Sequence, residues 1–224
     1  ALRKSTTSDN AYGIRVVISP TNWYDAGAGG TAYIGSFTWN SDTPCWVFTQ
    51  QLGNGEKYIA EAISHEVGHT VGLYHDGVGG SSPSEYYFGQ GSWAPIMGVG
   101  YYKNLSQWSK GEYLNANQTE DDTAIIATNN NGDLRNDDAG NTLATAAHLQ
   151  ILPDNSLANE GVITTPADVD AFRFKTSGGS VSLAVTQVAS GPNLDILAEL
   201  RDASNNLVAS SNPDTALNAT ITAS

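Results

Sequence analysis

The sequence has little cysteine, little methionine and no long apolar run. Cys45 is the only cysteine, so no intrachain disulfide can form and cysteine usage leaves the compartment open. No apolar run approaches the roughly 18 residues of a membrane-crossing helix, so no membrane span is expected. The sequence begins at Ala1 without an initiator methionine or a signal peptide, which is what we expect of a processed chain.

Basic residues are also scarce. The chain has 10 lysines and arginines against 23 acidic residues, and its formal net charge is -13. Such a surface repels phosphate backbones, so nucleic acid is excluded as a partner. The acidity fits either a solubilising surface or carboxylate sites for calcium, and calcium is kept as a second candidate ion.

The composition is that of a globular protein. Of the 224 residues, 40% are apolar and 15% are charged, which is enough for one large domain or two small ones. The 23 glycines, together with abundant Asn, Ser and Thr, favour short strands joined by many turns.

The first half of the chain predicts strands followed by a helix. Strands are expected at 12–18, 31–37 and 45–49. Apolar residues then recur every four positions over 56–71, which predicts a helix with one apolar stripe, and Gly72 is placed to end it. Further helices are expected at 105–114 and after Thr119, a good N-cap.

Composition changes after residue 128. An Asn, Asp and Gly-rich linker is expected at 129–140, between a first domain at 1–128 and a second domain at 141–224. The second domain has an all-β texture, with short apolar runs separated by turns at 161–163, 169–174, 180–185, 194–200 and 206–209.

The most informative segment is residues 65–76, HEVGHTVGLYHD. His65 and His69 are four residues apart, so on a helix their side chains share one face and can hold one metal ion. A catalytic zinc site needs a third protein ligand and one open position. His75 supplies this ligand if the chain turns back after the helix, and Gly72 allows such a turn.

Glu66 follows the first predicted ligand directly. From that position its carboxylate can take a proton from metal-activated water and pass it to a leaving amine. This chemistry is peptide-bond hydrolysis without a covalent enzyme intermediate. Two blander interpretations stay open: histidines scattered without a common role, and a zinc site without activity. Other divalent ions can also occupy such a ligand set.

The same residues carry a family resemblance. HExxHxxGxxH is the metzincin signature, and with Asp76 after the third histidine the segment resembles the reprolysin or adamalysin branch. The resemblance implies that Met97 lies in a Met-turn under the metal. It also implies an α+β fold, with a zincin-like catalytic domain built from a small mixed sheet and an active-site helix, acting on a protein or peptide substrate.

Other positions are similar to parts of this family. Residues 31–35 resemble the edge strand that binds extended substrate, although a plain sheet strand fits them equally. Residues 99–102 would form a wall of the S1′ pocket, and neither Tyr101 nor Tyr102 matches a metal-ligating tyrosine. Asp76 is expected to anchor the turn or to orient a ligand.

The chain departs from the family in two respects. Adamalysin relatives carry several disulfides, whereas this chain can form none, which favours a secreted, extracellular bacterial enzyme. Only 64 residues precede His65, so we expect the N-terminal strand and backing helix of the family's sheet to be abbreviated.

The second domain resembles the bacterial pre-peptidase C-terminal domain, a small β-sandwich. The similar segments are 136–142, 167–174 and 193–197, and the chain stops at Ser224 before the final strand expected of that family. Asp168 and Asp170 are candidate calcium ligands, with solvated turn residues as the plainer interpretation. The module would assist secretion, bind a surface or polymer, or serve a structural role.

The sequence therefore predicts a secreted zinc endopeptidase with His65, His69 and His75 as metal ligands and Glu66 as general base and acid. The alternative from another class is a catalytically inactive metal-containing scaffold whose β module serves binding or adhesion. A hydrolase of another bond, such as a deacetylase, is a third candidate, and it would need a small closed pocket.

Overall fold

The computed structural model describes residues 13–129, 134–189 and 191–224. The chain divides into two compact units, Ala1–Asp133 with Val188–Asn193 and Leu134–Gln187 with Leu194–Ser224. Part of the linker predicted at 129–140 and the first residue of the strand predicted at 12–18 lie outside the described residues. The domain limits at 128 and 141 stay a prediction.

The first unit contains a small mixed sheet. Its strands are β1 (Val16–Ser19), β2 (Gly30–Thr31) and β3 (Cys45–Phe48), in the order β1-β3-β2. Strands β1 and β3 are parallel, whereas β2 runs antiparallel to β3 and lies at the edge. The sheet is anchored through β3, because Cys45, Val47 and Phe48 are fully buried.

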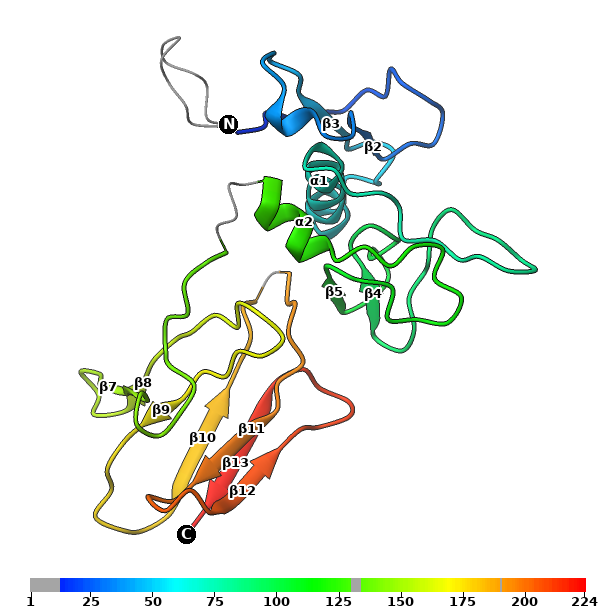
Figure 1. The fold of residues 1–224 in the computed structure, drawn as a ribbon. Coiled ribbons are helices and arrows are strands. Elements are labelled where there is room, and N and C mark those ends of the chain that lie inside the picture. The colour runs from blue at the N-terminus through cyan, green and yellow to red at the C-terminus, as the bar shows by residue number, and fades with distance from the viewer. Residues whose placement is uncertain (1–12, 130–133, 190) are drawn as a thin grey trace. The chain divides into compact units, whose positions relative to one another are not determined.

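The helix α1 (Glu56–Thr70) follows β3 and lies beside β2 and β3 (Figure 1). It confirms the helix predicted at 56–71. Its apolar stripe packs Ile59 and Ile63 against a core of Val47, Leu52 and Ala62. This packing fixes the face of α1 that points away from the sheet.

The C-terminal end of α1 is a Schellman motif. The N–H of Gly72 donates to the carbonyl of His69 at 2.9 Å, and the N–H of Leu73 donates to the carbonyl of Gly68 at 3.1 Å. Gly72 has φ of 109°, a conformation that L side chains rarely adopt. The chain therefore reverses direction within three residues of His69.

The chain after this turn forms a second core. Val71, Leu73 and Met97 are its buried members, and the apolar side chains packed against them are Phe37, Ile96, Trp108, Ile125 and Ile126. The strands β4 (Trp93–Pro95) and β5 (Leu105–Gln107) precede and follow Met97 in the sequence, and they pair in parallel. The helix α2 (Asp122–Asn129) contributes two of the packed isoleucines.

The strand predicted at 31–37 is wrong beyond Thr31. Gly35 has φ of 74°, its N–H donates to the carbonyl of His69 at 2.9 Å, and the 3₁₀ helix η1 (Ser36–Thr38) follows. The bond to His69 draws this segment onto the end of α1, so it cannot continue along β3.

The first of the two later helix predictions is also wrong. Residues 105–107 form β5 rather than the start of a helix at 105–114, because Gln107 accepts the N–H of Ile96 at 2.8 Å. Gly111, with φ of 77°, then interrupts the segment. The helix predicted after Thr119 does exist as α2, but it begins at Asp122, and Asp121 accepts the N–H of Ala124 at 3.1 Å.

The second unit contains only strands among its described residues. They are β6 (Ala147–His148), β7 (Gln150–Ile151), β8 (Leu157–Ala158), β9 (Phe172–Arg173), β10 (Val181–Val185), β11 (Ala198–Arg201), β12 (Leu207–Ser211) and β13 (Ala219–Ala223).

These strands pair two by two. The pairs are β6 with β9, β7 with β8, β10 with β13 and β11 with β12. The strands β10, β11, β12 and β13 lie side by side in Figure 1. Ala219 and Ile221 of β13 are buried, as is Ile196, which precedes β11. The apolar run at 161–163 forms no strand. The β-sandwich itself stays a prediction.

No helix in the described part of the chain has the length and apolar character needed to cross a membrane.

The turn at Gly72 gives a test of the fold. We expect Gly72→Ala to destabilise the first unit by about 1–3 kcal/mol, because alanine is strained at this φ and its Cβ would lie 3.2 Å from Asn129 Nδ2. Urea unfolding followed by tryptophan fluorescence reports on this unit alone, because all five tryptophans precede residue 109. Gly79→Ala is the control, since Gly79 meets nothing closer than 3.7 Å. Equal midpoints for both variants would contradict the assignment.

Candidate metal centre

Three histidines gather at the end of α1. His65 and His69 lie one turn apart on the helix, and the turn at Gly72 returns the chain so that His75 faces them. The ring centroids are 4.8 Å apart for His65 and His69, 5.1 Å for His65 and His75, and 4.6 Å for His69 and His75. One ring nitrogen from each residue lies within 4.8 Å of the other two. The structure thus brings together the three residues predicted as ligands.

Each imidazole is oriented by a hydrogen bond at Nδ1. His65 Nδ1 lies 2.8 Å from the Ile96 carbonyl, and His69 Nδ1 lies 2.8 Å from the Leu73 carbonyl. His75 Nδ1 lies 2.7 Å from Glu85 Oε1. Because all three partners are acceptors, Nδ1 carries the proton in each ring and Nε2 presents a lone pair.

The bare nitrogens create a site that fits a cation. His69 Nε2 and His75 Nε2 are 2.9 Å apart, although neither carries a proton to share. Desolvation lowers the pKa of His69, so protonation of this ring does not readily relieve the contact. Desolvation also lowers the pKa of His65 to about 3. Three imidazole nitrogens at one point are a ligand set typical of Zn²⁺.

Glu66 follows His65 directly in α1 and is 7% exposed. Burial raises its pKa to about 8. The edge strand passes so close that a Cβ at Gly30 would lie 2.5 Å from Glu66 Oε1 and 2.7 Å from the Trp46 carbonyl oxygen. Only glycine therefore fits at position 30 while the Glu66 side chain keeps this position.

The turn around Met97 packs against α1. Met97 is fully buried, and a Cβ at Gly68 would lie 2.5 Å from its Sδ. The two neighbouring carbonyls also reach the site, since Ile96 accepts His65 Nδ1 and Met97 accepts the N–H of Asp76 at 2.9 Å. The turn and the histidine-bearing segments are therefore joined by packing and by hydrogen bonds.

Asp76 anchors the segment that follows the third histidine. It is fully buried, and Oδ1 accepts Gln118 Nε2 at 3.0 Å and Tyr113 Oη at 3.4 Å. Desolvation raises its pKa to about 6. Of the two roles expected for Asp76, these contacts fit anchoring of the turn, because its hydrogen bonds go to Tyr113 and Gln118 and not to a histidine.

Two residues near the histidines were missed by the sequence analysis. Glu85 contacts His75 as described above. The ring of Tyr86 lies 4.4 Å from that of His75 and 6.1 Å from that of His65, and desolvation raises its pKa to about 12. Both residues come from a Gly, Ser and Tyr-rich segment without periodicity, so their spacing from His75 carries no signal.

A second group of potential ligands lies in the other unit. Asp137, Asp138 and Asp170 bring one carboxylate oxygen each within 4.8 Å of the others. Asp168, the other candidate calcium ligand predicted from the sequence, is not in this group, and its Oδ2 accepts the N–H and hydroxyl of Thr164 at 2.6 and 2.9 Å. Asp170 Oδ1 is buried without a hydrogen-bond partner, and desolvation raises the pKa of its carboxyl group.

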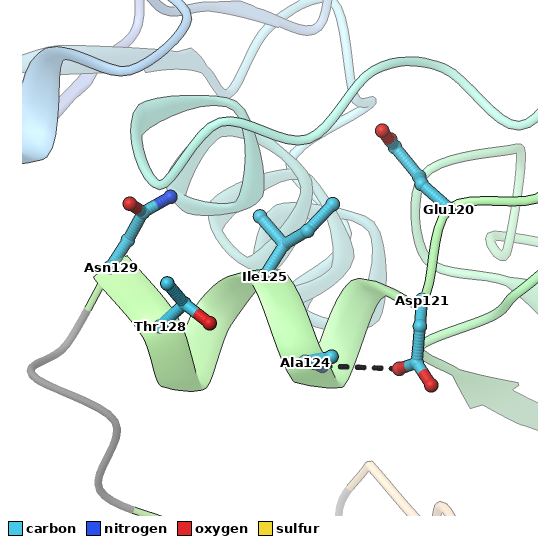
Figure 2. A pocket seen from close by; sticks show the side chains of 6 residues that line it. All are labelled: Glu120, Asp121, Ala124, Ile125, Thr128 and Asn129. Carbon is cyan, nitrogen blue, oxygen red and sulfur yellow. Dashed lines mark hydrogen bonds between the residues drawn. The ribbon is translucent and has the colours of Figure 1, made fainter.

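A surface hollow lies along α2 (Figure 2). The side chains that line it are Glu120, Asp121, Ala124, Ile125, Thr128 and Asn129. None of the three histidines takes part, so this hollow is separate from the candidate metal centre.

Comparison with known proteins agrees with the histidine group. A family model described as metallo-peptidase family M12B reprolysin-like matches residues 2–76, a segment that ends just after His75. No curated protein and no solved structure matches the chain. The family match over about a third of the chain, together with the three histidines, supports a metalloprotease that uses zinc.

Packing under α1 can be tested through metal affinity. We expect Gly68→Ala to weaken Zn²⁺ binding by about tenfold or more, because its Cβ would displace Met97 and with it the Ile96 carbonyl that orients His65. Competition with a chromophoric chelator measures the affinity. Ser64→Ala on the same helix is the control, since its hydroxyl bonds only the Ala60 carbonyl. Unchanged affinity in Gly68→Ala would show that the Met97 turn does not support the site.

Proposed function

We propose that the chain is a secreted zinc-dependent endopeptidase of the metzincin type. The observation that carries the proposal is the convergence of ring nitrogens from His65, His69 and His75, with the buried carboxylate of Glu66 directly after His65 in α1. The reprolysin-like match over residues 2–76 supports the same activity. The secreted, bacterial origin rests on the family resemblance and on the absence of an intrachain disulfide.

Zinc bound by His65, His69 and His75 would act as a Lewis acid, polarising a peptide carbonyl and making water a stronger acid. Glu66 would accept the proton of the attacking water and deliver it to the leaving amine. Its burial suits this task, since a pKa raised toward neutral pH lets the carboxyl group both accept and release a proton there. Gly30 permits this arrangement, because any side chain there would push Glu66 away.

Substrate would bind along the edge of the sheet. Among the described strands, β2 pairs only with β3, so its other edge can accept an extended peptide through main-chain hydrogen bonds. This edge passes directly over Glu66 at Gly30. We also propose that the turn at Met97 is a Met-turn and that residues 99–102 form a wall of the S1′ pocket. The close packing of Met97 on Gly68 supports the first of these assignments.

The role of Glu66 is tested by Glu66→Gln. We expect kcat/KM on a denatured protein substrate to fall by about 10²–10⁴-fold, because glutamine cannot accept the proton. Zinc content should stay equal, since Glu66 is not among the three metal ligands. Glu56→Gln, an exposed carboxylate in the first turn of α1, is the control.

Two results would contradict the proposal. Equal activity in the intact chain and in Glu66→Gln would remove Glu66 from the mechanism. One bound zinc with no hydrolysis by either protein would favour the alternative function, an inactive metal-containing scaffold whose β module binds a surface or polymer.

We propose calcium as a second ion, in the unit that resembles the pre-peptidase C-terminal domain. The grouping of Asp137, Asp138 and Asp170 supports this, because one buried oxygen of Asp170 has no partner. Three carboxylates gathered in this way repel one another, and a hard cation with oxygen ligands would relieve that repulsion. The same ion would tie the segment around Asp137 to the one around Asp170.

We expect Asp170→Asn to weaken Ca²⁺ binding by about tenfold or more, since it removes one of three anionic ligands. Titration calorimetry of the zinc-loaded protein with Ca²⁺ measures the affinity. Asp214→Asn, an exposed residue of the same unit, is the control. Absence of any binding heat in the intact chain would mean that these carboxylates are solvated turn residues.

A further inference from the structure

We propose that Glu85 is a positioning residue, which holds the third metal ligand, His75, through its Nδ1 proton. The inference rests on the proposed metal centre and adds a residue outside the ligand motif. It concerns the only one of the three imidazoles that is oriented by a side chain. His65 and His69 are oriented by backbone carbonyls at 2.8 Å, whereas His75 is oriented by Glu85 Oε1 at 2.7 Å.

The difference follows from where each histidine lies. His65 and His69 project from α1 toward carbonyls that the Met97 turn and the end of the helix supply. His75 lies beyond the Schellman turn, in a segment that leaves the helix and has no such carbonyl at its ring. A charged acceptor from another segment takes the place of the carbonyl, and a charged acceptor makes the stronger hydrogen bond.

The backbone places Glu85 beside His75 by a short two-stranded pairing. Val78 and Ser84 exchange both backbone hydrogen bonds at 2.8 Å, and the N–H of Tyr87 donates to the Asp76 carbonyl at 2.7 Å. The pairing is close, since a Cβ at Gly77 would lie 2.4 Å from the Ser84 carbonyl oxygen. The loop that leaves His75 is thus fastened back against it on both sides of Glu85.

The ring of His75 is constrained on its face as well as at its edge. Tyr86 lies 4.4 Å from it between centroids, tilted by 40°. Ser84 Oγ donates to the Tyr86 carbonyl at 2.8 Å, which fixes the backbone at Tyr86. With Nδ1 held by Glu85 and the face covered by Tyr86, Nε2 of His75 is left pointing toward His69 Nε2 at 2.9 Å.

A carboxylate in this position has two effects on a metal ligand. It fixes the tautomer that leaves Nε2 free, and it increases the basicity of that nitrogen. Loss of such a partner costs about 10–100-fold in metal affinity in other metalloproteins. Because the Glu85 side chain is 67% exposed, water can partly replace it, so we expect a loss in the lower part of that range.

The experiment measures Zn²⁺ affinity by chelator competition in the full chain. We expect Glu85→Ala to bind Zn²⁺ about tenfold more weakly than the intact chain. Glu85→Gln keeps an acceptor oxygen without the charge, so its affinity should lie between the two. The visible absorption spectrum of the Co²⁺-substituted protein is the second readout, and Glu85→Ala should shift it because His75 is reoriented.

Asp42→Ala is the matched control. Asp42 is a carboxylate of similar exposure, 65%, whose ion pair with Arg15 at 3.0 Å involves no histidine. The Asp42→Ala substitution removes the same charge from the same unit, so the Zn²⁺ affinity of this variant should equal that of the intact chain. An equal loss in Asp42→Ala would mean that net charge alone is responsible and would overturn the inference.

The remaining outcomes separate this inference from the proposed function. Unchanged affinity and an unchanged Co²⁺ spectrum in both Glu85 variants would overturn the role of Glu85 while leaving the metal centre intact. An intact chain that binds no Zn²⁺ would overturn both. Binding with the expected ranking but no proteolysis by the intact chain would support Glu85 and overturn only the proposed activity.

Discussion

The structure of the first unit depends on how α1 ends. A helix alone can bring two imidazoles to one point, because residues four apart share a face. The third has to come from chain that has already left the helix, and the Schellman turn at Gly72 provides that reversal. The same turn exposes the Leu73 carbonyl to His69 Nδ1, so the element that returns the chain also orients a ligand. Any rearrangement of the turn therefore changes both the position of His75 and the orientation of His69.

The apolar packing around Met97 serves the same geometry. Met97 fits against Gly68 because that residue has no side chain, and Leu73 packs in the same core. The carbonyl before Met97 orients His65, and its own carbonyl accepts the N–H of Asp76. Burial lowers the pKa of His65 and of His69, and a cation held by the ring nitrogens would relieve the close approach of His69 and His75. The hydrophobic packing that stabilises this core therefore also holds the histidine rings in position.

Much of the candidate site was predictable from the sequence, and the limits have a physical pattern. The histidine spacing and the helix over 56–70 depend on local periodicity, which the sequence displays directly. Glu85 depends on the pairing of Val78 with Ser84, a tertiary contact without a spacing rule. The strand expected at 31–37 and the helix expected at 105–114 failed for a related reason. Each segment is fixed by a bond to a distant backbone group, at His69 and at Ile96, which overrides local preference.

The burial of Glu66 bears on whether the centre is an enzyme or an inert scaffold. A structural metal site needs its ligands and an apolar surround, and a buried carboxylate beside it is a net cost to folding because desolvation disfavours the charged form. The fold nevertheless accommodates this carboxylate, with a glycine on the edge strand at the one point where any side chain would collide with it. Strained or desolvated groups of this kind concentrate where chemistry requires them. The arrangement of Gly30 over Glu66 is therefore easier to explain by proton transfer at a substrate bound along β2 than by stability.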